Sequence, residues 1–135
     1  MLSSNSNRNG LRREFDAAIK LHRAHKSRQA AKALEQLAAD HPSSAPVAGM
    51  LGGVYFDLGD FQQAARWFKR ATKLSPKSEL ASVGLFHSLW ELDRTADAVA
   101  EMRRFLRGSD SPEYTKLLRD LTVEGRLVPH IANVA

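Results

Sequence analysis

Residues 45–78, APVAGMLGGVYFDLGDFQQAARWFKRATKLSPKS, carry the pattern that identifies the fold class of this 135-residue chain. Apolar residues recur there at helical spacing in two segments, which a short turn around Gly59 separates. Asp60 and Gln63 stand at the spacing of a capping box, so the second helix is expected to begin there. Pro76 then prevents that helix from continuing. The stretch therefore predicts a pair of amphipathic helices joined by a tight turn.

The same pattern returns when the chain is shifted by 34 residues in either direction. The positions that come into register are apolar each time. They are Ala30, Ala64 and Ala98; Leu34, Phe68 and Met102; Leu37, Ala71 and Phe105; and Leu21, Tyr55 and Leu89. A 34-residue period of paired helices is typical of a helical solenoid, in which each pair buries its apolar face only by stacking on its neighbours. The sequence thus predicts an all-α fold with about seven helices.

The register also divides the chain. We expect residues 1–10 to form a flexible arm, because Ser and Asn compete with helix and there is little apolar surface to bury. A repeat domain then spans residues 11–124. Its parts are three units at about 11–44, 45–78 and 79–110 and a cap helix at 112–124. Residues 125–135 form an apolar tail, which we expect to dock on this chain or on a neighbouring one.

Composition excludes several classes of protein. The chain has 43% hydrophobic and 26% charged residues, which is ordinary for a globular domain. It has neither an apolar run long enough to span a membrane nor the apolar segment of a signal peptide, so we expect a cytoplasmic protein. The absence of cysteine excludes disulfides and thiolate chemistry. Because no phosphate-binding loop and no nucleophile–base pair is visible, we predict no enzymatic activity and no cofactor.

The 34-residue repeat pattern resembles that of the tetratricopeptide repeat family. Six positions of the family motif are matched in the central unit: Leu51, Gly52, Tyr55, Ala64, Phe68 and Pro76. Ala48 stands where the motif usually has tryptophan, and the flanking units match less well. The resemblance covers about residues 11–110 and implies three tandem repeats with a C-terminal cap helix, arranged as a right-handed α–α superhelix. It also implies a non-catalytic protein–protein interaction module, such as an adaptor, scaffold or chaperone-like protein.

The resemblance implies a concave groove, lined by the first helix of each pair, that holds a peptide or helix of another protein. The residues that the register puts on this side are Arg12, Phe15, Ile19, His22, Arg23, Pro46, Gly49, Gly53, Phe56, Asp57, Leu80, Val83, His87, Trp90 and Glu91. Some family members grip a C-terminal carboxylate with Lys and Asn here. Phe15 and Ile19 stand at those positions, so we expect no such clamp. The groove looks more similar to those of secretion chaperones or assembly adaptors.

Two features of this set suggest an apolar ligand. His22, Phe56 and Trp90 repeat at 34-residue steps, which predicts an aromatic stripe along the groove. Gly49 and Gly53 lie one turn apart in the middle of a helix, where each costs about 1 kcal/mol relative to Ala. We predict that a ligand backbone approaches them closely. The alternative interpretation is that the glycines relieve crowding between helices and that the aromatic residues belong to the core.

The net charge of +5 leaves nucleic acid as an alternative partner. Basic residues gather towards the N-terminal end and on the fourth predicted helix: Arg8, Arg12, Arg13, Lys20, Arg23, Lys26, Arg28, Lys32, Arg66, Lys69, Arg70 and Lys73. Phosphate contacts need little beyond such charge. The aromatic residues are not interleaved with the basic ones, as a platform for single strands requires, so protein binding is the favoured interpretation.

Two further alternatives concern self-association and metal. The apolar tail over residues 126–135 could enter the groove of a second copy, which would make the protein a homo-oligomer. His22 and His25 lie three residues apart, a spacing that can hold a metal on a helix. No third ligand is placed to complete that site, so we predict no bound metal.

Overall fold

The computed structural model describes residues 2–123, and the side chains of residues 8–122. This part of the chain forms seven helices and no strand, which confirms the predicted all-α fold. The helices are α1 (Leu2–Arg23), α2 (Ser27–Asp40), α3 (Ala45–Asp57), α4 (Phe61–Leu74), α5 (Glu79–Glu91), α6 (Thr95–Leu106) and α7 (Pro112–Val123). The predicted docking of the tail at 125–135 lies outside the described residues.

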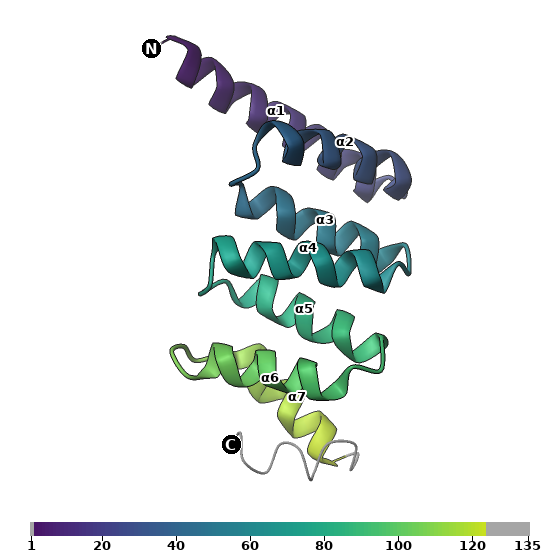
Figure 1. The fold of residues 1–135 in the computed structure, drawn as a ribbon. Helices are drawn as coiled ribbons and strands as arrows, with labels where there is room; N and C mark the ends of the chain where they lie inside the picture. The colour runs from purple at the N-terminus through teal and green to yellow at the C-terminus, as the bar shows by residue number, and fades with distance from the viewer. Residues whose placement is uncertain (1, 124–135) are drawn as a thin grey trace.

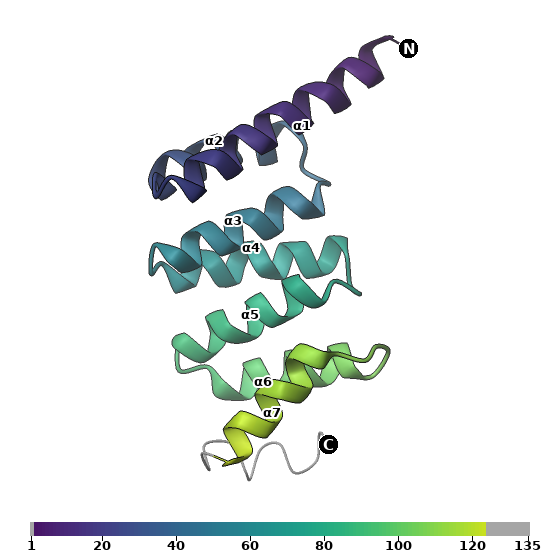
Figure 2. The same cartoon turned by 180° about the vertical axis from the view of Figure 1, so that it is seen from behind.

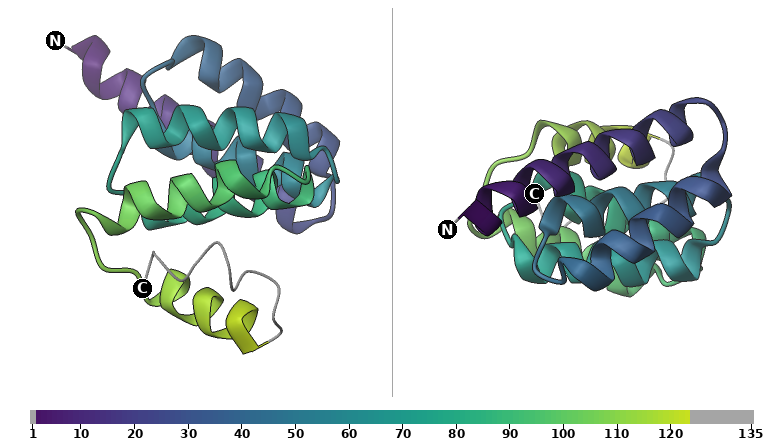
Figure 3. Two further views of the ribbon diagram at one scale, coloured as in Figure 1. Left: turned by 60° about the horizontal axis from the view of Figure 1, so that its bottom comes forward. Right: turned by 90° about the horizontal axis from the view of Figure 1, so that it is seen from above.

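The helices pair as hairpins that stack on one another in two layers. Helices α2, α4 and α6 form one layer, nearer the viewer in Figure 1, and we call it the second-helix layer. Helices α1, α3 and α5 form the other, which faces the viewer in Figure 2, and we call it the first-helix layer. Helix α7 lies at the end of the stack, opposite α1 and α2 (Figure 3). This is the superhelix of helical hairpins that the 34-residue period predicts.

Side-chain caps set the starts of α3, α4, α5 and α7, and at α7 the hydroxyl of Ser111 accepts a hydrogen bond from the backbone N–H of Tyr114 (2.9 Å). Ser44 accepts a hydrogen bond from the backbone N–H of Val47 (3.3 Å), which begins α3. Ser78, which stands 34 residues later, accepts one from the N–H of Ala81 (3.2 Å) and begins α5. Asp60 caps α4 in the same way. Each cap satisfies a backbone donor that has no partner inside its helix, so these boundaries follow from local sequence.

Helix α1 corrects the prediction for the N-terminus. It begins at Leu2, whereas the sequence pattern places the start of helix at Leu11 and a flexible arm over residues 1–10. Extending a helix that has already formed adds one hydrogen bond for each residue ordered and needs no new nucleus. Weak helix formers such as Ser and Asn can therefore be carried along. The first turns of α1 project beyond the stacked hairpins in Figure 1.

The core consists of two main apolar clusters. One lies among α1, α2 and α3, and the other among α4, α5, α6 and α7. Tyr55 packs against both clusters and so joins them. The small registered residues Ala30, Ala64 and Ala98 are all 0% exposed, since larger side chains of neighbouring helices pack on them. Gly52 serves the same purpose at its site, because a β-carbon there would lie 2.7 Å from the ring of Phe68.

A buried polar network attaches α7 to the last hairpin. The hydroxyl of Ser82 on α5 donates to Glu101 Oε2 on α6 (2.6 Å) and lies 2.7 Å from the hydroxyl of Tyr114 on α7. Arg104 holds both carboxylate oxygens of Glu101, with Nε–Oε1 2.8 Å and Nη2–Oε2 2.6 Å. It also donates to the carbonyl oxygen of Pro76 (3.0 Å). The ion pair thus has the extra hydrogen bonds that a buried charge requires.

Candidate partner-binding groove

An apolar groove of about 520 Å³ opens on the first-helix layer. Helices α1, α3 and α5 supply its sides, and α4 contributes to its floor. The residues that line it, which we call the apolar groove, are Phe15, Ala45, Pro46, Gly49, Met50, Gly53, Phe68, Ala71, Ser75, Ser78, Leu80 and Ala81. The described residues in this lining include no charged side chain. A ligand here would therefore gain its binding free energy mainly from apolar contact.

The two mid-helix glycines of α3 make the groove deep. A β-carbon on Gly49 or Gly53 would have no atom within 4 Å, so neither glycine relieves crowding between helices. This finding excludes the steric alternative for these two positions among the described residues. Because the glycines carry no side chains, the groove reaches down to Phe68 and Ala71, which are 6% and 1% exposed.

Large apolar residues stand beside the glycines. Phe15 comes from α1 and is half-buried, and Leu80 comes from the first turn of α5. Leu80 is 76% exposed, which is unusual for a leucine of a folded domain. The groove therefore combines an open backbone surface with the half-buried ring of Phe15 and the largely exposed side chain of Leu80.

The structure brings together only part of the predicted set. Phe15, Gly49, Gly53, Pro46 and Leu80 all line the apolar groove. The remaining predicted residues lie outside this lining: Arg12, Ile19, His22, Arg23, Phe56, Asp57, Val83, His87, Trp90 and Glu91. The register of 34 residues predicts the layer of helices on which this groove lies, but the groove occupies only the half of that layer near the starts of α3 and α5.

The predicted aromatic stripe is not part of the groove. Phe56 packs edge-on against Phe61, with ring centroids 5.1 Å apart. Trp90 stacks on Phe86 at 5.8 Å with an interplanar angle of 14°. Phe56, Trp90 and Val83 are all half-buried and pack against the second core cluster. For these residues the core interpretation describes the structure better than a ligand contact does.

The side chains of His22 and Asp57 contact one another, and neither lines the apolar groove. The Nε2 atom of His22 lies 2.9 Å from Asp57 Oδ2, and its Nδ1 atom lies 3.2 Å from the hydroxyl of Ser27. The pair connects α1 to α3. Within residues 2–123 no group of three potential ligands is placed to hold a metal ion, and His25 does not join His22 in one.

His87 lies on the surface of α5 with its ring edge-on to Phe86, at a centroid distance of 5.6 Å. Desolvation lowers its pKa below the usual value for histidine, and the carboxylates of Glu91 and Glu113 act in the opposite direction. The ring is therefore mostly neutral at pH 7, so His87 adds no positive charge to this layer.

The floor of the groove is the part that the sequence pattern does not predict. Met50, Ser75 and Ser78 line the groove although the register does not place them there, and Phe68 and Ala71 are expected in the core alone. The pair of glycines is the available signal, because a helix without side chains at two successive turns exposes whatever packs beneath it.

Comparison with known proteins agrees with this architecture. Residues 15–79 match the family model of the tetratricopeptide repeat. The match and the stacked hairpins together identify tetratricopeptide repeats in this chain. No curated protein matches the sequence.

Solved structures of two proteins share the fold. A point mutant of MamA has a TM-score of 0.67 at 20% identity over 76% of this chain and 74% of that one. A second structure, MamA from AMB-1, has the same TM-score at 21% identity, and the match covers 78% of this chain but only 58% of that one. The type III secretion translocator chaperone SycD of Yersinia enterocolitica has a TM-score of 0.70 at 14% identity, over 86% and 87% of the two chains. At these identities the likeness shows the fold alone.

Proposed function

We propose that this protein is a non-catalytic interaction module that binds an apolar segment of another protein in the apolar groove. The observation that carries the proposal is the open surface of Gly49 and Gly53, where an added β-carbon would meet nothing within 4 Å. Two helix-destabilising residues on one exposed face, beside an uncovered Leu80, are better explained by a ligand than by stability.

The size and chemistry of the groove indicate what would fit. Its volume of about 520 Å³ can take a few aliphatic or aromatic side chains. An amphipathic helix presents such side chains one turn apart, and the backbone of a ligand can come close to a helix that carries glycine. The uncharged lining supports apolar recognition and offers nothing to grip a terminal carboxylate.

The fold relatives support the general role. One of them, SycD, is a type III secretion translocator chaperone. We extend to this chain only the broad idea of holding a segment of a protein partner. None of the described helices is both long and apolar enough to cross a membrane. The cytoplasmic location expected from the sequence stays a prediction.

The test is to fill the groove. The variant Gly49→Leu/Gly53→Leu is compared with wild type and with Gly49→Ala/Gly53→Ala, which makes a similar change to the α3 backbone but leaves most of the volume open. Each is used as bait in a nuclease-treated lysate from the source cells, after circular dichroism has shown that it is folded. The proposal expects a partner that the wild type and the alanine pair retain and the leucine pair loses.

Two results would count against the proposal. A folded leucine pair that retains the same partner would place the site elsewhere. Recovery of nothing but copies of the bait would favour self-association, and comparing the solution mass of the full chain with that of a chain shortened to residues 1–124 would then test the tail.

A further inference from the structure

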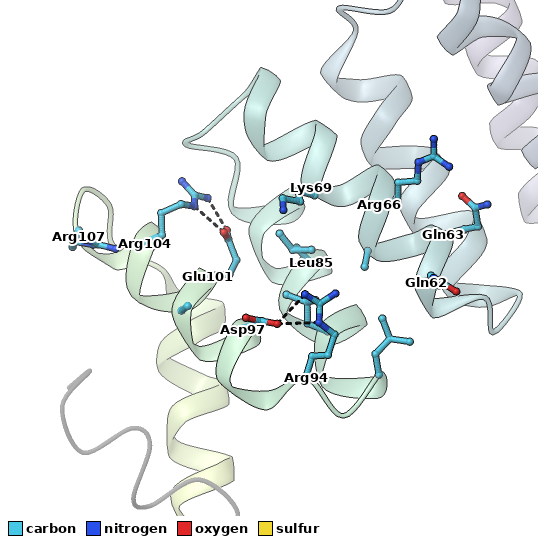
Figure 4. A pocket seen from close by; sticks show the side chains of 14 residues that line it. Gln62, Gln63, Arg66, Lys69, Leu85, Arg94, Asp97, Glu101, Arg104 and Arg107 are labelled. Carbon is cyan, nitrogen blue, oxygen red and sulfur yellow. Dashed lines mark hydrogen bonds and ion pairs between the residues drawn. The ribbon is translucent and has the colours of Figure 1, made fainter.

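A second groove lies on the opposite side of the molecule, in the second-helix layer. It has a volume of about 710 Å³ and runs between α4 and α6 with α5 beneath it. The residues that line it, which we call the basic groove, are Gln62, Gln63, Ala65, Arg66, Lys69, Leu85, Leu89, Leu92, Arg94, Asp97, Ala100, Glu101, Arg104 and Arg107. Figure 4 shows Arg66 and Lys69 on one helix and Asp97, Glu101 and Arg104 on another, with Leu85 between them.

The floor of the basic groove is aliphatic. Leu85, Leu89 and Leu92 come from α5 and the turn that follows it, and the small side chains of Ala65 and Ala100 leave room above them. Leu85 and Leu89 belong to the second core cluster and are 5% and 7% exposed. A ligand in this groove would therefore contact apolar side chains at its centre and charged ones at its sides.

The acidic residues of this groove are already neutralised. Asp97 is paired with Arg94, with contacts of 2.8 and 2.9 Å, and Glu101 is held at both oxygens by Arg104. Figure 4 shows both pairs as dashed lines.

Three cations remain in excess. Arg66, Lys69 and Arg107 are exposed and make no ion pair or hydrogen bond through their side chains within the described part of the chain. They lie on both sides of the groove, two on α4 and one at the end of α6. The groove thus carries unbalanced positive charge over an aliphatic floor, which favours a ligand that is both acidic and apolar.

The equivalent place one repeat earlier carries different residues. Trp67 occupies the register position of Glu101 and packs against the first core cluster. Glu35 occupies the position of Lys69, and it accepts a hydrogen bond from the hydroxyl of Tyr55. The combination of this lining with these cations therefore comes from the particular residues of α4, α5 and α6 and is not a general consequence of the repeat.

We propose that the basic groove binds an acidic peptide segment of a second protein, whose leucine-like side chains contact the floor and whose carboxylates pair with Arg66, Lys69 and Arg107. A protein ligand is favoured over nucleic acid because the floor offers aliphatic groups and no aromatic ring on which a base could stack. This surface is separate from the apolar groove, so the two proposals can fail independently.

The test uses fluorescence anisotropy with labelled probes and the full chain. The first probe is a helical peptide with Leu and Glu on one face, and a second has Lys in place of every Glu. A third has Ser in place of every Leu, and the fourth is a single-stranded oligothymidine. The groove variant is Arg66→Glu/Lys69→Glu. The control variant, Arg28→Glu/Lys32→Glu on α2, changes the net charge equally at two exposed residues away from the groove.

The proposal expects the Leu/Glu peptide to bind the wild type more tightly than any other probe. The groove variant should weaken that binding by about tenfold or more, since two charge contacts become repulsive. The control variant should weaken it by no more than about twofold, because salt screens distant charges.

Three outcomes would overturn the proposal. Tighter binding of oligothymidine than of the Leu/Glu peptide would identify a nucleic-acid surface. Equal losses in the groove and control variants would show that only net charge attracts the probe. No measurable binding of the Leu/Glu peptide to the wild type would show that the groove does not recognise this chemistry.

Discussion

The ring of Phe68 occupies the space that a side chain on Gly84 would need. A β-carbon built on Gly84 would lie 2.5 Å from two atoms of that ring, closer than such atoms approach in proteins. Gly84 belongs to α5 and Phe68 to α4, so the contact sets how closely the second and third hairpins stack. Phe68 is only 6% exposed and also meets Gly52 on α3, which leaves the ring little room to move.

Gly84→Ala should therefore destabilise the protein. Overpacking of this kind costs about 1–3 kcal/mol, which exceeds the gain of up to about 1 kcal/mol from better helix propensity. We expect a lower midpoint of urea unfolding, measured by circular dichroism. Gly53→Ala is the matched control, because its β-carbon meets nothing within 4 Å, and it should stabilise the protein by about 0.5–1 kcal/mol. If Gly84→Ala raised the midpoint as much as Gly53→Ala does, the ring would not be confined.

Because Ser82 and Tyr114 are hydrogen-bonded to each other, substitutions at the two residues should have strongly coupled effects on the free energy of unfolding. Ser82→Ala leaves the buried hydroxyl of Tyr114 without this partner, so it should cost about 1–3 kcal/mol. Tyr114→Phe removes the hydroxyl itself and leaves Ser82 bonded to Glu101, so it should cost less. The double variant should be more stable than the sum of the two losses predicts, as a double-mutant cycle in urea would reveal. If the losses of stability in the two single variants added up to the loss in the double variant, the hydrogen bond between Ser82 and Tyr114 would be contradicted.

Two arginines in register should differ in their contribution to stability. Arg70 donates to the carbonyl oxygen of Pro42 (2.9 Å), and Arg104 donates to that of Pro76. Only Arg104 also neutralises a carboxylate, Glu101, which is 9% exposed. Arg104→Ala should thus cost about 1–3 kcal/mol, whereas Arg70→Ala on the surface should cost about 1 kcal/mol or less. Equal losses in thermal unfolding would mean that Glu101 finds solvent or another partner.

Both tyrosines of the chain should ionise at a higher pH than an unperturbed tyrosine does. Burial and the hydrogen bond to Glu35 raise the pKa of Tyr55 to about 12, and burial raises the pKa of Tyr114 well above its usual value. A group whose pKa is raised on folding stabilises the protein fully below the pKa of the unfolded state, about 10 for tyrosine. That contribution should be lost as the pH rises from about 10 through the folded values.

Ultraviolet difference absorbance gives the measurement for the tyrosines. The native chain should show almost no tyrosinate at pH 10, whereas the chain in concentrated urea should be about half ionised there. A Glu35→Gln variant should lower the pKa of Tyr55 and leave that of Tyr114 unchanged. A native titration that matches the unfolded one would show that neither hydroxyl is protected.

Capping and periodicity act over a few residues, and these parts of the fold can be read from the sequence. Asp60 caps α4 as the capping-box spacing predicts, and the registered alanines Ala30, Ala64 and Ala98 are buried. The sequence pattern places the start of α1 too late. Helix propensity is assigned to each residue separately, whereas a helix that has already formed extends cooperatively into its neighbours.

The helix pairs, their 34-residue register and the layer of helices that carries the apolar groove all follow from spacing along one chain, so the amino-acid sequence is enough to predict them. Which residues of that layer stay open depends on how the helices pack. Phe15 and Trp90 are both predicted on the groove side of their helices, yet Trp90 stacks on Phe86 while Phe15 lines the groove. The basic groove also arises only on packing, since Lys69 and Arg107 come from different helices that stacking brings to one site. A side chain is available to a partner only where no other helix has packed against it, and that depends on the whole fold.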